Sequence, residues 1–171
     1  MSEKSVGIRY SCGVLTVSDK GARGERTDTS GPAICDMLAT AGFELAVTGM
    51  VPDQQEGIAA VLLEWADRRV VDLIVTTGGT GVAPSDVTPE ATRPLLDREV
   101  PGISEAMRQA SLAITARAML SRGVAGIRGK TLIINLPGSE RAARENLATV
   151  LAVLPHAIAK IKGDPGDCGR S

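Results

Sequence analysis

Residues 70–81 read VVDLIVTTGGTG, an apolar, β-branched run that stops abruptly in a glycine-rich segment. An almost uninterrupted apolar strand is typical of a parallel sheet that is covered on both faces, because such a strand has no side that faces water. The glycines that follow mark the point where the strand ends and a loop begins. The stretch therefore predicts a buried central strand of an α/β protein.

Short β-branched runs alternate with longer helical patterns on both sides of this strand. Such alternation is typical of helices that cross over a mostly parallel sheet, so we predict an α/β fold of three layers, α/β/α. The predicted strands are residues 11–17, 43–51, 70–77 and 131–135. The predicted helices are residues 30–40, 53–69, 102–120 and 139–162. A further helix is predicted to start with Thr88 as its N-cap and Pro89 at its first helical position. Pro155 is expected to kink or divide the last helix.

Composition limits the classes of function. The chain has 171 residues, and we expect one domain at residues 10–163 between tails at 1–9 and 164–171. A net charge of −1 with one Trp, one Tyr and one Phe argues against a nucleic-acid-binding module. No run approaches the roughly 18 apolar residues that span a bilayer. Three cysteines without a C-x-x-C pair favour a reducing compartment, so we expect a cytoplasmic protein without a membrane or nucleic-acid partner.

Polar and glycine-rich groups follow each of four predicted strands. Ligands of open parallel sheets bind beyond the carboxyl ends of the strands, where the loops diverge and helix N-termini point inward. We therefore expect these four groups to form one site. They are Ser18-Asp19-Lys20, Pro52-Asp53, Thr76-Thr77-Gly78-Gly79-Thr80-Gly81 and Leu136-Pro137-Gly138-Ser139.

The glycine-rich segment suits a phosphate, because backbone N–H groups can turn toward an anion where no Cβ intervenes. Thr77 and Thr80 would add hydroxyl donors. A tight turn without any ligand is the alternative reading of the glycines alone. Cations for a polyphosphate could come from Lys20 and from three arginines. These arginines are Arg23, Arg26 and Arg128.

Asp19, Asp53 and Asp86 are the acidic residues near the expected phosphate site. Carboxylates beside bound phosphates repel them unless a divalent cation intervenes, and Mg²⁺ is the natural bridge. Helix capping by Asp53 and bracing of a turn by Asp86 remain alternatives. The only histidine, His156, falls in the last predicted helix, which argues against a Ser-His-Asp or Cys-His mechanism.

The glycine-rich segment is followed by a second motif, Asp86-Val87-Thr88-Pro89-Glu90-Ala91. Thr76-Thr77-Gly78-Gly79-Thr80-Gly81 together with this second motif resembles the signature of the MoaB/MogA family of molybdenum-cofactor biosynthesis proteins. Further matches are Val17-Ser18-Asp19, Ser121-Arg122 with residues 125–129, residues 132–139, and residues 155–164 near the end. The likeness covers residues 10 to 164 in family order, which makes it more specific than any single motif.

The resemblance implies molybdopterin adenylyltransferase activity, with ATP and molybdopterin as substrates and Mg²⁺ as cofactor. By position, it implies catalytic and metal-binding roles for Asp53 and Asp86, with Ser18, Asp19 and Lys20 as candidates on the nucleotide side. The residues that it implies for molybdopterin and its phosphate are Thr77, Gly78, Gly79, Thr80, Gly81, Ser121, Pro137, Gly138 and Ser139. It also implies a homotrimer and a partner enzyme that inserts molybdate. Ser85 stands where many members carry arginine.

Two other functions stay open at this point. A non-catalytic molybdopterin-binding or scaffold paralogue would keep the same fold and glycine loop without reacting the pterin. An unrelated nucleotide-dependent α/β protein is the weaker possibility. Release of pyrophosphate separates the enzyme from the carrier, and pterin binding excludes the third reading.

Overall fold

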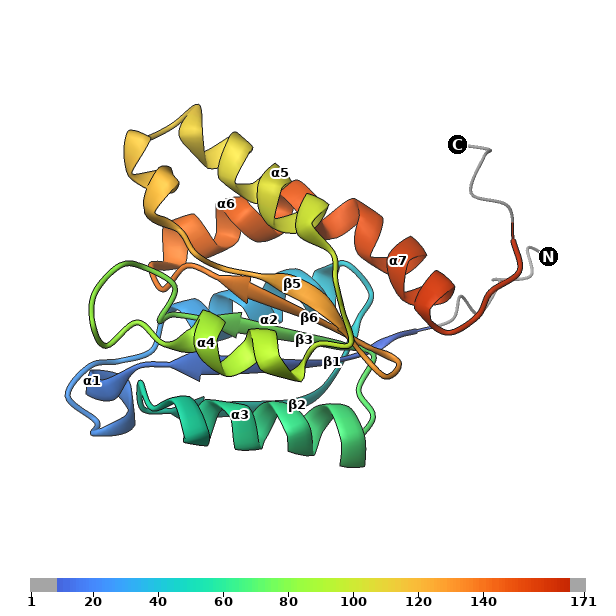
Figure 1. Ribbon diagram of the computed structural model, residues 1–171, viewed down its shortest axis with the longest axis horizontal. Helices are drawn as coiled ribbons and strands as arrows, with labels where there is room; N and C mark the ends of the chain where they lie inside the picture. Colours follow the sequence, from blue (N-terminus) through green and yellow to red (C-terminus); the bar gives the residue numbers. More distant parts are fainter. Residues whose placement is uncertain (1–8, 167–171) are drawn as a thin grey trace.

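The computed structural model describes residues 9–166 and contains a six-stranded sheet in the order β2-β1-β3-β6-β5-β4 (Figure 1). Strands β2, β1, β3 and β6 are parallel, whereas β5 and β4 pair antiparallel at one edge. The strands are β1 (Ser11–Val17), β2 (Glu44–Val51), β3 (Leu73–Thr77), β4 (Arg98–Glu99), β5 (Ala125–Arg128) and β6 (Thr131–Leu136). The α/β class and the mostly parallel sheet are confirmed.

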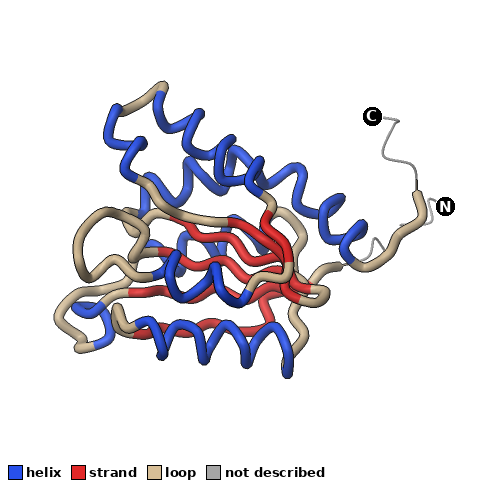
Figure 2. Tube along the Cα trace, in the orientation of Figure 1, coloured by secondary structure: helices blue, strands red, loops and turns tan. Residues whose placement is uncertain are grey.

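Helices cover both faces of the sheet (Figure 2). They are α1 (Asp19–Ala22), α2 (Ser30–Thr40), α3 (Gln55–Leu63), α4 (Thr88–Thr92), α5 (Pro101–Leu112), α6 (Glu140–Val150) and α7 (Leu154–Ile161). Helices α3 and α4 lie on one face, and α2, α5, α6 and α7 lie on the other. This is the three-layer arrangement that the sequence predicts. In the described residues no helix is both long and apolar enough to cross a membrane.

Two hydrophobic cores form because side chains alternate along each strand. In β3, Leu73 and Val75 enter the core under α2, α5, α6 and α7, while Ile74 enters the core under α3 and α4. All three are fully buried, with 0% of their surface exposed. The central strand is therefore covered on both faces, as its apolar sequence indicates.

The boundaries of several elements differ from the predictions. The strand predicted from residue 70 begins at Leu73, since Val70 is exposed and has φ of +52°. The helix predicted to reach residue 120 ends at Leu112, and a short 3₁₀ helix follows at Ala116–Leu120. Thr88 is not the N-cap of α4; Val87 occupies that position. Pro155 does divide the last helix, because α6 ends at Val150 and α7 begins at Leu154.

Strands β4 and β5 are absent from the predicted elements. The β5 segment contains Gly126 and is short, so its own sequence carries little strand preference. It becomes a strand because Arg128 pairs with Thr131 across a tight turn in which Gly129 has φ of +55°. Its partner in this hairpin, the strongly apolar strand β6, therefore decides its structure. Residues 1–8 and 167–171, which hold most of the two predicted tails, lie outside the described residues.

The order of the strands fixes where a ligand can enter. The chain leaves β1 toward β2 on one side and then returns to place β3 on the other side of β1. The carboxyl ends of β1 and β3 therefore lie at a topological switch point, where the loops diverge and leave a crevice. Figure 1 shows the segments after β1, β3 and β6 together at one end of the sheet, away from the chain termini.

Candidate functional site

Four strand-to-loop junctions meet at this edge of the sheet. The backbone N–H of Ser18, after β1, donates to the end of β2 (2.9 Å), and that of Gly78, after β3, donates to the end of β6 (3.1 Å). Asp19 and Asp53 form a reciprocal pair. The N–H of Asp19 donates to Asp53 Oδ2 (2.8 Å), and the N–H of Asp53 donates to Asp19 Oδ1 (2.9 Å). The four groups that the sequence places after separate strands are therefore neighbours in space.

Gly78 and Gly79 occupy positions that other residues fill only with strain. Their φ angles are +104° and +66°. A Cβ on Gly78 would lie 2.2 Å from the carbonyl oxygen of Val17, and a Cβ on Gly79 would lie 2.3 Å from Thr88 Oγ1. Gly78 lets the loop after β3 pass close to the end of β1, and Gly79 lets it pass close to Thr88 at the start of α4.

The glycine loop is held in place by buried hydrogen bonds. The backbone N–H of Thr88 donates to the carbonyl of Gly79 (3.0 Å), and its hydroxyl donates to the carbonyl of Gly78 (2.9 Å). Thr77 donates its hydroxyl proton to the carbonyl of Pro137 (2.8 Å). The Thr77 hydroxyl, which the sequence suggests as a donor to a phosphate, instead donates its proton to the loop after β6. These contacts within the protein define the path of the loop.

The guanidinium of Arg122 fastens the other half of this loop. Its Nε donates to the carbonyl of Gly81 (2.7 Å), its Nη2 donates to the carbonyl of Asp86 (2.6 Å), and it forms an ion pair with Glu90. The backbone N–H of Arg122 also donates to the carbonyl of Thr80 (2.8 Å). One side chain therefore connects the glycine loop, the turn that bears Asp86, and α4.

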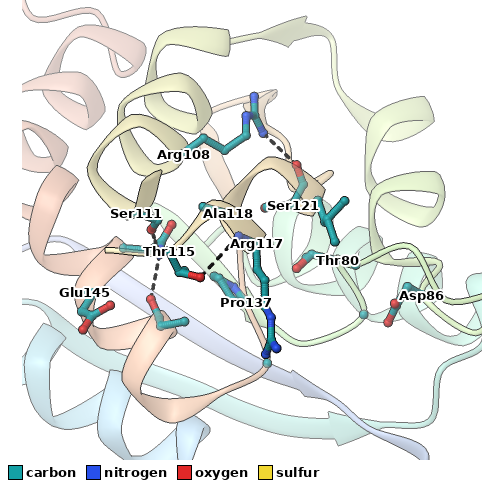
Figure 3. Close-up of a pocket in the computed structure, with 16 residues that line it drawn as sticks. Thr80, Asp86, Arg108, Ser111, Thr115, Arg117, Ala118, Ser121, Pro137 and Glu145 are labelled. Atoms are coloured by element: carbon teal, nitrogen blue, oxygen red, sulfur yellow. Dashed lines mark hydrogen bonds between the residues drawn. The ribbon is translucent and has the colours of Figure 1, made fainter. Parts of the chain in front are cut away.

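Two pockets open on the junction. The first, which we call the α5/α6 pocket, has a volume of about 400 Å³ and extends from the glycine loop to α5, the 3₁₀ helix and α6 (Figure 3). The second, the α1/α2 pocket, has a volume of about 290 Å³ and extends toward α1 and α2. Both are lined by Gly79, Asp86 and Gly138. Two ligands could therefore approach one another across a shared wall.

The predicted site residues divide between the two pockets. The α5/α6 pocket contains Gly79, Thr80, Gly81, Asp86, Ser121, Pro137 and Gly138. The α1/α2 pocket contains Ser18, Asp53, Thr77, Gly78, Gly79, Asp86, Gly138 and Ser139. Asp19 stands behind Asp53 as its hydrogen-bond partner. Lys20 lies on α1 with an exposed side chain that lines neither pocket, so the structure does not bring it into the site.

Asp53 is an acid in an unfavourable environment. Burial raises the pKa of its carboxyl above the ordinary value, and the nearby carboxylates of Asp19 and Asp86 raise it further, against the opposing hydrogen bond from the Asp19 backbone. Asp53 does not cap its own helix, because Gln54 is the N-cap of α3. Asp86 does brace a turn, since its Oδ2 accepts the backbone N–H of Ala83 (2.9 Å).

A sequence model of the family described as "Probable molybdopterin binding domain" matches residues 13–156. The chain belongs to this molybdopterin-binding domain family. Among solved structures, the molybdopterin biosynthesis enzyme MoaB of Thermus thermophilus is 58% identical with a TM-score of 0.86, covering 92% of this chain and 99% of that one. The likeness to MoaB and MogA that the motifs indicate is thereby confirmed.

Curated relatives fall into two groups of different length. The molybdopterin adenylyltransferase of Helicobacter pylori strain J99 is 41% identical over 157 residues, which are 89% of this chain and 88% of that protein. The molybdenum cofactor synthesis protein cinnamon of Drosophila melanogaster is 47% identical over 153 residues, 89% of this chain but 26% of that protein. The chain thus spans about a quarter of cinnamon, and the same holds for the gephyrin of Dictyostelium discoideum, at 25%.

The carboxylates of Asp53 and Asp86 are suitable ligands for a Mg²⁺ ion. Asp53 and Asp86 each use Oδ2 to accept a backbone N–H, and Asp53 Oδ1 points toward the glycine loop, 3.3 Å from the position of a Cβ on Gly79. Within residues 9–166 no three His, Cys, Asp or Glu side chains form a cluster that could hold a metal. Mg²⁺ is commonly bound by one or two carboxylates together with substrate phosphates, which suits this donor set.

Sequence reasoning missed two cations of the α5/α6 pocket. Arg108 on α5 and Arg117 on the 3₁₀ helix both line it. Figure 3 shows Arg117 running along the pocket toward Pro137. Both arginines are close in sequence to Ser121, which could have indicated them. The prediction of one continuous helix over residues 102–120 omits the turn after Leu112 that places Arg117 at the same pocket as Arg108. Of the expected cations, Arg26 lines the α1/α2 pocket, whereas Arg23 and Arg128 are paired with Glu25 and Asp67.

Proposed function

We propose that this protein is a molybdopterin adenylyltransferase. In this reaction an oxygen of the terminal phosphate of molybdopterin attacks the α-phosphorus of ATP and forms a new P–O bond. The bond from the α-phosphorus to the bridging oxygen of the β-phosphate breaks, and pyrophosphate leaves with the electron pair. The observation that carries the proposal is the pair of pockets with a common wall of Gly79, Asp86 and Gly138.

The larger pocket suits the pterin and the smaller one suits the nucleotide. Ala118, Leu120, Pro137 and Ala142 give the α5/α6 pocket apolar walls for a flat ring. The α1/α2 pocket is lined by hydroxyls, glycines and the exposed Arg26, and also by the carboxylates of Asp28, Asp53 and Asp86. A polyphosphate would therefore bind there together with a divalent cation that neutralises the repulsion. The two reacting phosphates would then meet at the glycine loop, where backbone N–H groups are free of Cβ obstruction.

The residues at the shared wall position and neutralise the reactants. Asp53 and Asp86 would hold Mg²⁺ through their carboxylates, and the ion would supply charge neutralisation on the ATP phosphates. The attacking phosphate is already ionised at neutral pH, so positioning contributes more than a general base. This agrees with a chain whose only histidine, His156, lies exposed on α7.

The relatives support this proposal and extend it. Proteins named molybdopterin adenylyltransferase match most of the chain in Helicobacter pylori and Escherichia coli, with 41% and 43% identity. By the same resemblance we propose a homotrimer in the cytoplasm that passes its product to a molybdate-inserting enzyme. The free cysteines Cys12 and Cys35 are in keeping with a reducing compartment.

Asp86→Asn tests the proposal. The amide oxygen keeps the hydrogen bond from Ala83, so the turn should survive, while the negative charge is lost. We expect molybdopterin binding to be retained and pyrophosphate release to fall roughly 100-fold or more. Asp36→Asn, an exposed change on α2, is the matched control and should leave turnover unchanged.

The assay also separates the enzyme from a carrier. Purified protein is incubated with molybdopterin, ATP and Mg²⁺, and pyrophosphate is measured. Tight pterin binding without pyrophosphate release by the unmodified protein would identify a binding or scaffold protein instead. Turnover of Asp86→Asn at the level of the unmodified protein would refute the role given to Asp86.

A further inference from the structure

The α5/α6 pocket has a polar end that the chemistry at the shared wall does not use. Ser111 and Thr115 line this end together with Glu145 and Asn146 of α6. In Figure 3, Glu145 and Ser111 lie on the opposite side of the pocket from Asp86. A ligand that fills the pocket therefore meets the glycine loop at one end and these side chains at the other.

Asn146 is fixed so that it offers an acceptor. The residue is 6% exposed, and its Nδ2 donates to the hydroxyl of Ser111 (2.9 Å) and to the carbonyl of Ala142 (2.8 Å). Both amide protons are thus committed. Its Oδ1 accepts no hydrogen bond from any residue in the described part of the chain, and the side chain lines the pocket.

Glu145 adds a carboxylate beside this amide. Its Oε1 accepts from Arg141 Nε at 2.9 Å, in an ion pair where the Glu145 side chain is 34% exposed and Arg141 is 81% exposed. No residue among 9–166 donates to its Oε2. An exposed partner of this kind is easily exchanged for a ligand. The polar end therefore presents acceptors on two consecutive residues and selects for a ligand edge rich in N–H donors.

We propose that Glu145 and Asn146 form the subsite that recognises the 2-amino-4-oxopyrimidine edge of the pterin ring. That edge carries an exocyclic amino group next to a ring N–H, and a carboxylate can accept both in parallel. The proposal rests on the proposed function, because it assigns the pterin to this pocket. The apolar walls at Ala118 and Leu120 would lie along the flat ring.

The same residues set the direction in which the substrate binds. The negative charge of Glu145 disfavours the phosphate at the polar end. Arg117 reaches from the middle of the pocket toward Pro137, on the side of the glycine loop. The pterin ring therefore enters the polar end, and its terminal phosphate lies at the wall shared with the α1/α2 pocket.

A pair of ligands that differ at one donor tests the subsite. The probes are 6-hydroxymethylpterin phosphate and its lumazine counterpart, in which a carbonyl replaces the 2-amino group. Fluorescence titration of the unmodified protein should show about 10- to 100-fold tighter binding of the pterin. Glu145→Gln should abolish this preference, because the amide has only one acceptor and its N–H₂ group tolerates a carbonyl.

Glu140→Gln is the matched control. Glu140 pairs with Arg144 four residues along the same helix, as Glu145 pairs with Arg141, but it does not line the pocket. This variant should keep the preference for the pterin. With molybdopterin and ATP, Glu145→Gln should raise the KM for molybdopterin about 10-fold or more and leave the KM for ATP unchanged.

The outcomes for the subsite and for the enzyme are distinguishable. Equal binding of the two probes by the unmodified protein, or an undiminished preference in Glu145→Gln, overturns the subsite even where pyrophosphate is released. A preference that Glu145→Gln abolishes supports the subsite even if the unmodified protein releases no pyrophosphate, in which case the transferase proposal fails.

Discussion

At the scale of single residues, the structure explains why the negative charge of Asp53 destabilises the folded protein. Its carboxyl is partly buried and lies near Asp19 and Asp86, so its pKa is raised. The three acids come from different segments of the chain, and Asp53 and Asp19 are 34 residues apart in the sequence. The sequence therefore predicts acids at strand ends but leaves open whether Asp53 caps a helix. Only the fold shows that Asp19 is its partner.

Asp53→Asn should stabilise the protein at neutral pH. Because the pKa of Asp53 is higher in the folded state than in the unfolded chain, its charge weakens the fold above the folded pKa and not below the unfolded one. The asparagine keeps an oxygen that accepts the N–H of Asp19. We expect a gain of a few tenths of a kcal/mol, roughly 1 °C in Tm, at pH 7.

Thermal unfolding measured across pH checks this sign. The difference between Asp53→Asn and the unmodified protein should shrink as pH falls and Asp53 becomes protonated. Asp36→Asn, on the exposed side of α2, should show a smaller change over the same range. A variant that is less stable than the parent at pH 7 would contradict the assigned environment of Asp53.

At the scale of elements, the strands that end at the site are predictable, and the segments that hold their loops in place are not. The run 70–77 is apolar enough to indicate β3 by itself, but Arg122 precedes a strand, β5, whose sequence carries little β preference. The guanidinium acts across the fold, on Gly81, Asp86 and Glu90. Nothing local in the sequence reports such contacts.

Arg122→Lys should impair turnover more than stability. A lysine has a single ammonium group and cannot contact Gly81, Asp86 and Glu90 together in the geometry of a planar fork. We expect kcat to fall about 10-fold or more as the Asp86 turn loosens. The free energy of unfolding should fall by only about 1 kcal/mol relative to the parent.

Arg128→Lys is the matched control for this prediction. Arg128 also binds a carboxylate through two nitrogens, with Asp67 as partner, and donates to the carbonyl of Leu95 (3.0 Å), but it lines neither pocket. Its variant should lose comparable stability and retain kcat. Equal losses of kcat in both lysine variants would show that Arg122 acts through general stability and not by positioning Asp86.

At the scale of the whole molecule, the two ends of the sheet serve different purposes. Both pockets lie at the carboxyl ends of the parallel strands. At the amino ends, Asp72, just before β3, makes the connecting contacts. Asp72 Oδ2 accepts the backbone N–H of Ser11 (2.8 Å) and its hydroxyl (3.1 Å), and Oδ1 pairs with Lys162 after α7. One buried carboxylate thus connects the starts of two strands with the last helix.

Asp72→Ala should therefore weaken the fold and spare the chemistry. Removing an acid that is 8% exposed leaves the Ser11 donors and the Lys162 ammonium without their partner, at a cost of about 2–3 kcal/mol. For a chain of this size that corresponds to a fall in Tm of about 5–10 °C. Pyrophosphate release measured well below the melting temperature should keep the KM values and kcat of the parent, because the Asp72 contacts lie at the end of the sheet opposite the pockets. Asp36→Ala should change neither property, and a large loss of kcat in Asp72→Ala would show instead that the two ends of the sheet are coupled.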